Sequence, residues 1–312
     1  MRERGIALMM VLWVLVFLSI LSMNFLKSTR WVTGSTHNLK EETLTYYQAL
    51  SGYHEALQYI ASDKDPQVDF LDEEGNFWID NETLPVTGKR DTDDGEVEIK
   101  ITDENSLVNI NFIQQDRLRK LLERAGVKEE EIIVIMDSVL DWRDPDKEHH
   151  LSGAEDDYYE SLTEPYKAKN GLFSVPEELT LVRGMKPEYF YGDGAGTAGL
   201  HSLITTFGKN AMNINTVSTE VMQFLGLNEV EIATIMKQRN KAYGGFRFIP
   251  HEFSVRGLNA MSTQTFRIEV TARTKNSPIG CRITGVVSRD PSPKGPELRT
   301  IYWRERAETV RT

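Results

Sequence analysis

The chain begins with a short charged segment that changes at once into a long apolar run. No charged residue occurs between Gly5 and Leu26, although Arg2 and Arg4 precede the run. A helix rises about 1.5 Å per residue, so this run spans ~33 Å, enough to cross a bilayer core of ~30 Å. The run is too long for a cleavable secretory signal and lacks an A-x-A-like site, which leaves an uncleaved signal anchor as one interpretation. The basic residues before the run predict that the remainder of the chain is translocated.

The next segment, residues 27–62, continues as an amphipathic helix. Its apolar residues recur at steps of three or four positions apart from one gap of seven, and we expect this stripe to pack against a sheet. The stripe consists of Leu39, Tyr46, Leu50, Tyr53, Leu57 and Ile60. Joined to the apolar run, the segment predicts one long N-terminal helix.

Strand signals occur in two separate parts of the chain. Residues 63–94 are rich in Asp, Gly, Asn and Pro and predict loops with short strands. Alternating or β-branched patterns predict longer strands over residues 96–102, 266–273, 280–287 and 298–303. The middle of the chain lacks such patterns.

This distribution predicts an α+β fold in which a helical domain interrupts a sheet domain. We expect residues 27–104 and 262–312 to form the discontinuous α+β domain, with an antiparallel sheet beside the long helix. Residues 105–261 form the inserted all-α domain.

The inserted part contains an internal repeat. Residues 126–136 align with residues 226–236, and six of the eleven positions are identical. An Asn-x-Asn pair precedes each copy and a Pro-x-Glu segment follows each copy, so the repeats extend over about 106–186 and about 210–258. The first copy is longer, and its additional residues include much of 141–168. We expect the Asn-x-Asn pairs to cap or bracket helix starts.

Each repeat reads as helix, glycine turn and helix, and it resembles a helix-hairpin-helix (SAM-like) unit. Such units often bind DNA through a hairpin with two glycines and nearby basic residues. Here the second glycine is missing and each following helix begins with acidic residues, which repel phosphate. The whole chain carries 36 Lys and Arg against 47 Asp and Glu, a net charge of −11. We therefore expect no nucleic-acid partner and a structural or protein-binding role for the repeats.

Composition adds two further limits. Hydrophobic residues make up 40% of the chain and charged residues 27%, as in ordinary globular proteins. The single cysteine, Cys281, cannot form an intramolecular disulfide and is expected to be buried in a strand. No Gly-x-Ser-x-Gly, Walker A, dinucleotide or His-Glu-x-x-His motif occurs, so the sequence predicts no catalytic site and no enzymatic activity.

The densest cluster of charge is an acidic segment. Residues 141–160 contain eight acidic and two basic residues. A hard cation such as calcium takes 6–8 oxygen ligands and tolerates irregular loops, although the spacing here is not that of an EF-hand. The candidate ligands are Asp141, Asp144, Asp146, Glu155, Asp156 and Asp157. The residues alone leave open a cation site and an acidic loop that is merely solvated.

Two histidines, His149 and His150, lie inside the acidic segment. Adjacent histidines on one loop rarely both bind a metal, and no cysteine is near them in the sequence. A transition-metal site is therefore not favoured. We expect Trp142, Tyr158 and Tyr159 to pack in a core.

The start of the chain also resembles a prepilin signal, a short basic leader that ends in glycine. This resemblance implies cleavage between Gly5 and Ile6 by prepilin peptidase and methylation of Ile6. Most pilin-like proteins carry Glu at the fifth mature position, where this chain has Met10. Loss of that Glu is typical of the minor pseudopilin K family of type II secretion systems.

The acidic segment carries the same resemblance. It reads Asp-Trp-Arg-Asp-Pro-Asp over residues 141–146 and Gly-Ala-Glu-Asp-Asp-Tyr-Tyr over residues 153–159. The minor pseudopilin K family has a similar signature, which implies calcium near this loop.

The resemblance as a whole implies a type IV pilin-like fold and a mechanical role. Family members stand at the tip of the periplasmic pseudopilus with the minor pseudopilins I and J and help to start its assembly. Residues 6–26 would cross the inner membrane, and the globular part would face the periplasm. A periplasmic DNA-uptake protein and a minor pilin of a type IV pilus are the alternatives.

Overall fold

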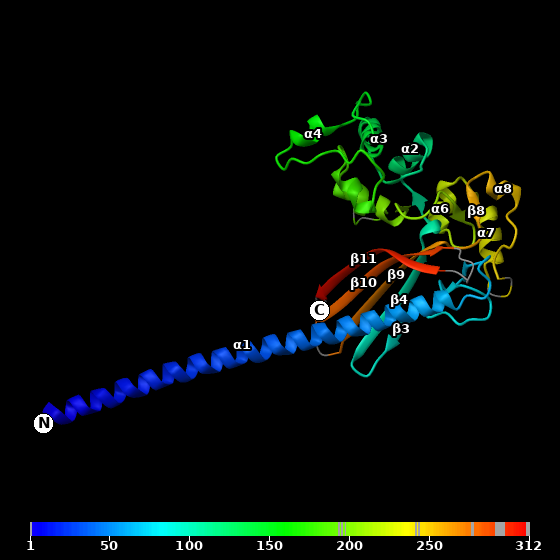
Figure 1. Cartoon of the computed structure of the whole chain (residues 1–312). Helices are drawn as coiled ribbons and strands as arrows, with labels where there is room; N and C mark the ends of the chain where they lie inside the picture. The colour runs from blue at the N-terminus through cyan, green and yellow to red at the C-terminus, as the bar shows by residue number, and fades with distance from the viewer. Residues whose placement is uncertain are drawn as a thin grey trace.

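The computed structural model describes residues 2–192, 194, 196, 198–240, 242, 244–275, 278–290 and 297–309 (Figure 1). The side chains of residues 2–8 and of Thr309 lie outside this description. The predicted processing site between Gly5 and Ile6 is therefore described by its helical backbone alone.

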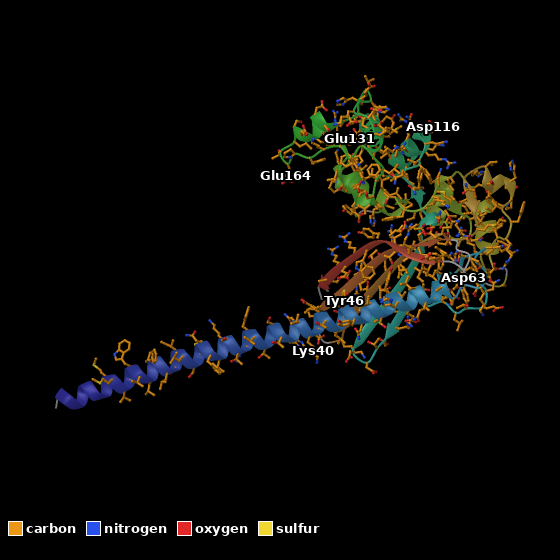
Figure 2. The ribbon with its side chains drawn as sticks, in the orientation of Figure 1. Lys40, Tyr46, Asp63, Asp116, Glu131 and Glu164 are labelled. Carbon is orange, nitrogen blue, oxygen red and sulfur yellow. The ribbon has the colours of Figure 1, made fainter. Side chains whose placement is uncertain are left out.

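A single helix, α1 (Arg2–Ala61), forms the N-terminal fifth of the molecule and projects from the globular body (Figure 1). Its part Met9–Ala61 contains a stretch that is long and apolar enough to cross a membrane, judged by length and composition. Figure 2 shows Lys40 just before the helix meets the sheet and Tyr46 at the sheet. Leu39 lies before the contact and is 63% exposed, so it is not part of the buried stripe as predicted.

Within the described residues, five antiparallel strands form the main sheet in the order β11-β10-β9-β4-β3. The strands are β3 (Gly88–Asp91), β4 (Gly95–Asp103), β9 (Thr265–Thr274), β10 (Ile279–Asp290) and β11 (Glu297–Thr309). The four longer strands were predicted, and β11 continues beyond its predicted end. Strand β4 precedes the inserted segment and pairs with β9, which follows it. The sheet is therefore completed by two distant parts of the chain.

The core of this part lies between α1 and one face of the sheet. The helix contributes Ala49, Tyr53, Ala56 and Ile60, and the strands contribute every second residue. Cys281 on β10 is 8% exposed and belongs to this core, as predicted. Figure 1 shows the inserted segment on the opposite side of the sheet from α1.

The remaining elements lie between α1 and β3 and in the inserted segment. Phe70–Leu71 (β1) and Phe77–Trp78 (β2) form a two-stranded hairpin after α1. The first repeat, with the short elements at its two ends, contains η1 (Glu104–Ser106), β5 (Val108–Asn109), α2 (Gln115–Arg124), α3 (Glu129–Arg143), α4 (Asp156–Glu160), η2 (Pro176–Leu181), α5 (Pro187–Tyr191), η3 (Leu200–Ser202) and β6 (Ile204–Thr205). The second repeat contains β7 (Met212–Asn213), α6 (Thr219–Phe224), α7 (Glu229–Gln238), α8 (His251–Ser254) and β8 (Leu258–Ala260).

The two repeats have the same internal geometry. Helix pairs α2–α3 and α6–α7 are each joined at a glycine in the left-handed region, Gly126 with φ 76° and Gly226 with φ 81°. Each repeat also contains one short parallel pairing, β5 with β6 and β7 with β8. Strands of two or three residues are too short to show an alternating pattern, so they could not be predicted from the sequence.

The Asn-x-Asn pairs do not cap helices, contrary to our expectation. Gln114 and Ser218 occupy the N-cap positions of α2 and α6. Asn111 instead binds the backbone of Phe173, and Asn215 binds the backbone of Phe246 in the same way. The pairs hold distant segments of each repeat together.

Candidate functional site

The acidic segment folds into a cluster at the C-terminal end of α3 and in the loop that leads to α4. Helix α3 begins with three glutamates and ends with Arg143, charges that match the helix dipole at both ends. The last turns of this helix place Asp141 on its buried side, and the loop returns Glu155 to the same region. Asp141 is fully buried and Glu155 is 2% exposed, while Asp144 is partly buried.

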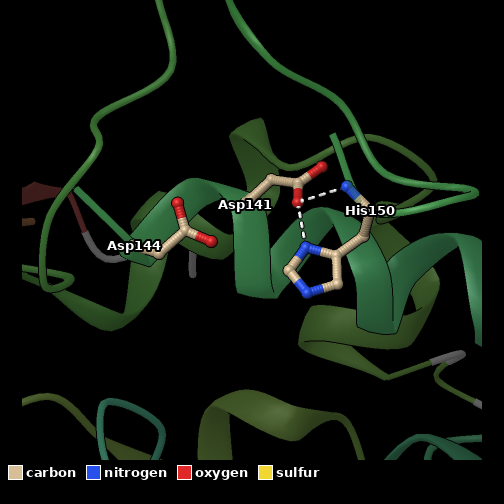
Figure 3. Close-up of side chains that lie close together, drawn as sticks. All are labelled: Asp141, Asp144 and His150. Carbon is tan, nitrogen blue, oxygen red and sulfur yellow. Dashed lines mark hydrogen bonds and ion pairs between the residues drawn. The ribbon is translucent and has the colours of Figure 1, made fainter. Parts of the chain in front are cut away.

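Figure 3 shows the contact between Asp141 and His150 beside Asp144. Asp141 Oδ1 accepts a hydrogen bond from the backbone N–H of His150 at 3.0 Å and also contacts His150 Nδ1. One ligand atom from each of Asp141, Asp144 and His150 lies within 4.8 Å of the others.

Several carboxylate oxygens of this cluster are buried without a partner. Among the described residues, no hydrogen bond reaches Asp141 Oδ2, Asp144 Oδ1 or either oxygen of Glu155. A buried carboxylate without a partner is costly, because the low-dielectric interior does not replace its hydration. The cluster therefore needs either a cation or bound protons to offset its charge.

The pKa values of the cluster shift in the direction that this arrangement predicts. Burial, and then the charges of Asp141 and Asp144, raise the pKa of Glu155 to about 7. Burial and the neighbouring Asp146 and Asp141 raise the pKa of Asp144 as well. The hydrogen bond to Asp141 raises the pKa of His150 by favouring its charged form.

The other three predicted ligands have partners of their own. Asp146 Oδ1 accepts the backbone N–H of Glu148 at 2.9 Å. Asp156 binds Lys147 Nζ at 2.9 Å and the N–H of Ala168 at 3.1 Å. Asp157 lies 3.1 Å from His149 Nε2. Of the six candidates, Asp141, Asp144 and Glu155 thus form the centre of the cluster.

Sequence reasoning set His150 aside, and the structure places it in the cluster. The sequence separation of nine residues from Asp141 gave no sign of this contact, because it depends on the path of the loop. Its Nδ1 meets Asp141 and therefore fixes the orientation of that carboxylate. His150 acts here as a partner of an acidic residue.

A glycine and an arginine hold the loop against α3. A side chain at Gly153 would collide with the carboxylate of Asp141, so this position requires glycine. Arg183 Nη1 donates to the Gly153 carbonyl at 2.9 Å and its guanidinium lies 4.8 Å from the centre of the Tyr158 ring. The loop is thereby fixed from both sides.

Aromatic residues pack in the core next to the cluster. Trp142 and Tyr159 are buried, and their rings meet edge to face at 5.2 Å. Phe173 stacks on Trp142 with 6.3 Å between ring centres. Trp142 and Tyr159 are packing residues, as expected, and Tyr158 packs at the edge of the same core. They support a rigid base for the acidic residues.

The donor atoms of the cluster suit a hard cation. Four unpartnered carboxylate oxygens come from three residues, and oxygen is the ligand that calcium and magnesium prefer. A site for a softer metal would use more nitrogen or sulfur donors.

Comparison with known proteins matches this chain to components of type II secretion systems. Residues 101–191, which include the cluster, match the family model "Type II secretion system (T2SS), protein K". Type II secretion system protein K of Aeromonas hydrophila is 29% identical over 241 residues, covering 70% of this chain and 69% of that protein. The protein K of Pseudomonas aeruginosa is 26% identical over 239 residues, covering 70% of this chain and 67% of its own.

A solved structure shares the fold. It is the GspK–GspI–GspJ complex of the type 2 secretion system from enterotoxigenic Escherichia coli, and one of its chains matches with a TM-score of 0.62 at 14% identity. The match covers 86% of this chain and 98% of the other. The fold and the family match together define a minor pseudopilin of the type II secretion system. Within that class, the chain is similar to the type II secretion system protein K family.

Proposed function

We propose that this minor pseudopilin forms the tip of the periplasmic pseudopilus, together with the minor pseudopilins I and J, and helps to start its assembly. The observation that carries the proposal is the absence of an acidic side chain at the fifth position after the predicted cleavage site, where Met10 stands. A carboxylate in a bilayer costs about 2.5–3.5 kcal/mol on insertion scales, so it is retained where it has a partner. A subunit with no subunit above it has no such partner.

The size of the inserted segment supports the same position. It lies beyond the sheet on the side away from α1 (Figure 1), where it would obstruct a further subunit stacked on this one. The solved complex contains a related fold together with GspI and GspJ, which supports the choice of partners. No catalytic role is included in the proposal.

Processing and location follow from the N-terminal helix. We infer that prepilin peptidase cuts between Gly5 and Ile6, that Ile6 is methylated, and that residues 6–26 remain in the inner membrane until assembly. The exposed apolar surface of α1 supports a lipid environment for this part of the helix. The globular part would then face the periplasm.

We also infer a division into two folding units. The supporting observation is a pair of separate hydrophobic cores, one between α1 and the sheet and one within residues 108–258. The proposed boundaries are residues 27–104 with 262–312 for the discontinuous pilin-like domain, and residues 105–261 for the insertion. The glycine turns at Gly126 and Gly226 support helix-hairpin-helix (SAM-like) units in a structural role, with no nucleic-acid partner.

Calcium is the cation that we propose for the acidic cluster. Asp141, Asp144 and Glu155 would supply ligands through their unpartnered oxygens. The other three candidates would lie around this centre: Asp156 keeps its contact with Lys147, Asp157 keeps its contact with His149, and Asp146 lies beside them. A bound cation would offset the buried negative charge and hold the loop of residues 144–155 on α3. Its role is structural.

Labelling of sheared pseudopili tests the tip position. Antibody–gold directed at the inserted segment is expected at one end of each filament, with label for the major subunit along the length as the control. Label for the inserted segment along the whole filament would contradict the proposal.

Mass spectrometry of the mature chain tests the processing step separately. A methylated Ile6 is the expected N-terminus. A chain that still begins at Met1 would show that no prepilin cleavage takes place.

A further inference from the structure

The outer strand of the sheet, β11, is a long edge strand with two chemically different faces. In the described residues it pairs on one side only, with β10, so its other backbone edge is outside the sheet. After an irregularity beside Ile301, residues 302–308 pair with β10 in unbroken register. An unpaired regular edge of this kind is able to accept a further strand.

One face of β11 lines a cleft between the sheet and the inserted segment. The cleft has a volume of 340 Å³, and Tyr302, Arg304 and Arg306 contribute to its wall from β11. The inserted segment contributes Pro176 and Phe207 from the opposite side. The cleft shares no residue with the acidic cluster.

The charges in this cleft are only partly neutralised within the chain. Arg282 stands directly opposite Arg306 in the register of β10 and β11, an arrangement of like charges that destabilises a sheet. Arg282 Nη2 binds Glu308 at 2.7 Å, whereas its buried Nε has no partner in the described part of the chain. The pair retains positive charge that an external carboxylate would offset.

The neighbouring charged residues leave Arg304 and Arg306 as the accessible cations. Arg267 is bound by the buried Glu104 at 2.6 Å. The other acidic residues in the wall are Glu177, which is 3.5 Å from Arg304, and Glu269. Arg306 forms no ion pair among the residues that the structure describes. An exposed pair at 3.5 Å is weak and exchanges readily with another carboxylate.

The opposite face of β11 offers an apolar contact. Trp303 is 39% exposed, although its ring also meets Tyr53 at 4.7 Å. Side chains of adjacent strands alternate between the faces in register. A strand beside β11 would therefore present one residue to Trp303 and the residues on either side of it to the cleft.

We propose that β11 accepts a strand from a partner protein in which acidic residues alternate with apolar ones. Carboxylates at every second position would reach Arg304 and Arg306, and an apolar side chain between them would cover Trp303. Backbone pairing with β11 would provide affinity, and the alternating pattern would provide specificity. The inference concerns a surface separate from the proposed tip function and does not depend on it.

The charge of β11 argues against a second copy of this chain as the occupant. Two β11 strands side by side would bring Arg304 and Arg306 of both copies together, which is unfavourable. The concave shape of the cleft and the backbone edge also favour a strand over a flat anionic surface such as a membrane.

Fluorescence anisotropy with the full chain in nanodiscs tests the proposal. The probe is the labelled peptide Glu-Val-Glu-Val-Glu-Val-Glu, and binding is expected below ~1 mM and weaker at high salt. The double variant Arg304→Gln/Arg306→Gln is expected to weaken binding about 10-fold or more. The matched control Arg299→Gln, on the same strand and 3.6 Å from Asp290, should change it less than about 2-fold.

Two further peptides separate strand pairing from simple charge attraction. A peptide with lysine in place of glutamate should not bind, and a peptide with proline at the central valine should lose most of its binding, because proline removes a backbone donor. Equal binding of either peptide, or unchanged binding by the double variant with an unchanged melting temperature, would overturn the proposal. Self-association through β11, detected by light scattering, would also overturn it.

Discussion

Asn111 holds Phe173 with both ends of its side-chain amide. Asn111 Oδ1 accepts the Phe173 N–H at 2.8 Å, and Nδ2 donates to the Phe173 carbonyl at 3.0 Å. In the second repeat Asn215 binds Phe246 with distances of 2.7 Å and 3.0 Å. The two contacts join segments that lie 62 and 31 residues apart in the sequence, respectively.

Replacing this asparagine should therefore destabilise the inserted segment. Asn111→Ala leaves buried backbone groups of Phe173 unpaired, and each such group costs about 1–3 kcal/mol. We expect a loss of about 2–3 kcal/mol in the free energy of unfolding, measured by thermal denaturation of the detergent-solubilised chain. Asn215→Ala should behave in the same way.

Asn210→Ala is the matched control for this experiment, because Asn210 is exposed on a loop of the same segment. Its effect should stay within about 0.5 kcal/mol. Equal effects of Asn111→Ala and Asn210→Ala would show that the amide contact contributes nothing.

Replacing one carboxylate of the acidic cluster should change both the stability of the protein and its response to calcium. Glu155→Gln removes a buried charge that has no partner among the described residues, so in the presence of a chelator the variant should be about 1–2 kcal/mol more stable than the wild type. Calcium should then stabilise the wild type and leave the variant nearly unchanged. Calorimetry with calcium and with chelator measures both effects.

Asp157→Asn serves as the control, because Asp157 is exposed and lies beside His149. This variant should keep the calcium response. A wild-type melting temperature that is identical with calcium and with chelator would contradict the cation proposal.

Gly153 should tolerate no side chain. In Gly153→Ala the new Cβ would collide with the Asp141 carboxylate, so either the loop or Asp141 must move. We expect a loss of about 1–3 kcal/mol in stability together with a weaker calcium response. Gly171→Ala is a control in the same loop region, because the nearest atom to its Cβ would be 3.9 Å away. A Gly153→Ala variant as stable as Gly171→Ala would show that the loop adapts freely.

The stability of the junction between the sheet and the inserted segment should depend on pH. Arg289 lies between two carboxylates, Asp63 and Asp69, and binds Asp69 Oδ2 at 2.6 Å. Two buried carboxylates share one guanidinium, and burial raises the pKa of Asp69 to about 7 in spite of Arg289. Burial also raises the pKa of Asp63, which Figure 2 shows at the end of α1.

The sign of this pH effect follows from the folded and unfolded pKa values. The unfolded aspartate loses its proton near its ordinary pKa of 3.8, whereas folded Asp69 keeps the proton up to about 7. The contribution of Asp69 to the free energy of unfolding is therefore fully present below about pH 4 and is lost as the pH rises to about 7. Asp69→Asn should remove this contribution, so the melting temperature of the wild type relative to the variant should fall between pH 5 and pH 7.5.

Asp116→Asn, at an exposed position on α2, is the control for general charge effects (Figure 2). A difference between wild type and Asp69→Asn that stays constant over this pH range would exclude proton uptake at Asp69.

Local patterns in the sequence were enough for the elements that pack on one face. The apolar stripe of α1 and the alternation of β4, β9 and β10 each record burial on one side, so the helix and strands were predicted close to their observed bounds. The repeat at residues 126 and 226 likewise showed the two glycine turns. Composition and spacing also located the acidic segment and its three central residues, although within a larger set.

Contacts between distant segments could not be predicted in this way. The role of Asn111 depends on where Phe173 lies, and the place of His150 depends on how the loop returns to α3. Leu39 fits the helical stripe and yet is exposed, because the sheet begins only beyond it. The edge of β11 that pairs with no other described strand follows from the order of the strands.

The sequence by itself determined the long apolar helix, the strands that flank a helical middle, the internal repeat and the acidic segment. These features follow from side-chain chemistry repeated at short spacing, which local structure obeys. Tertiary structure decided which acidic residues converge, which oxygens remain without a partner, and which face of β11 is open. Those properties depend on burial and on distances between parts of the chain that only the folded arrangement brings together.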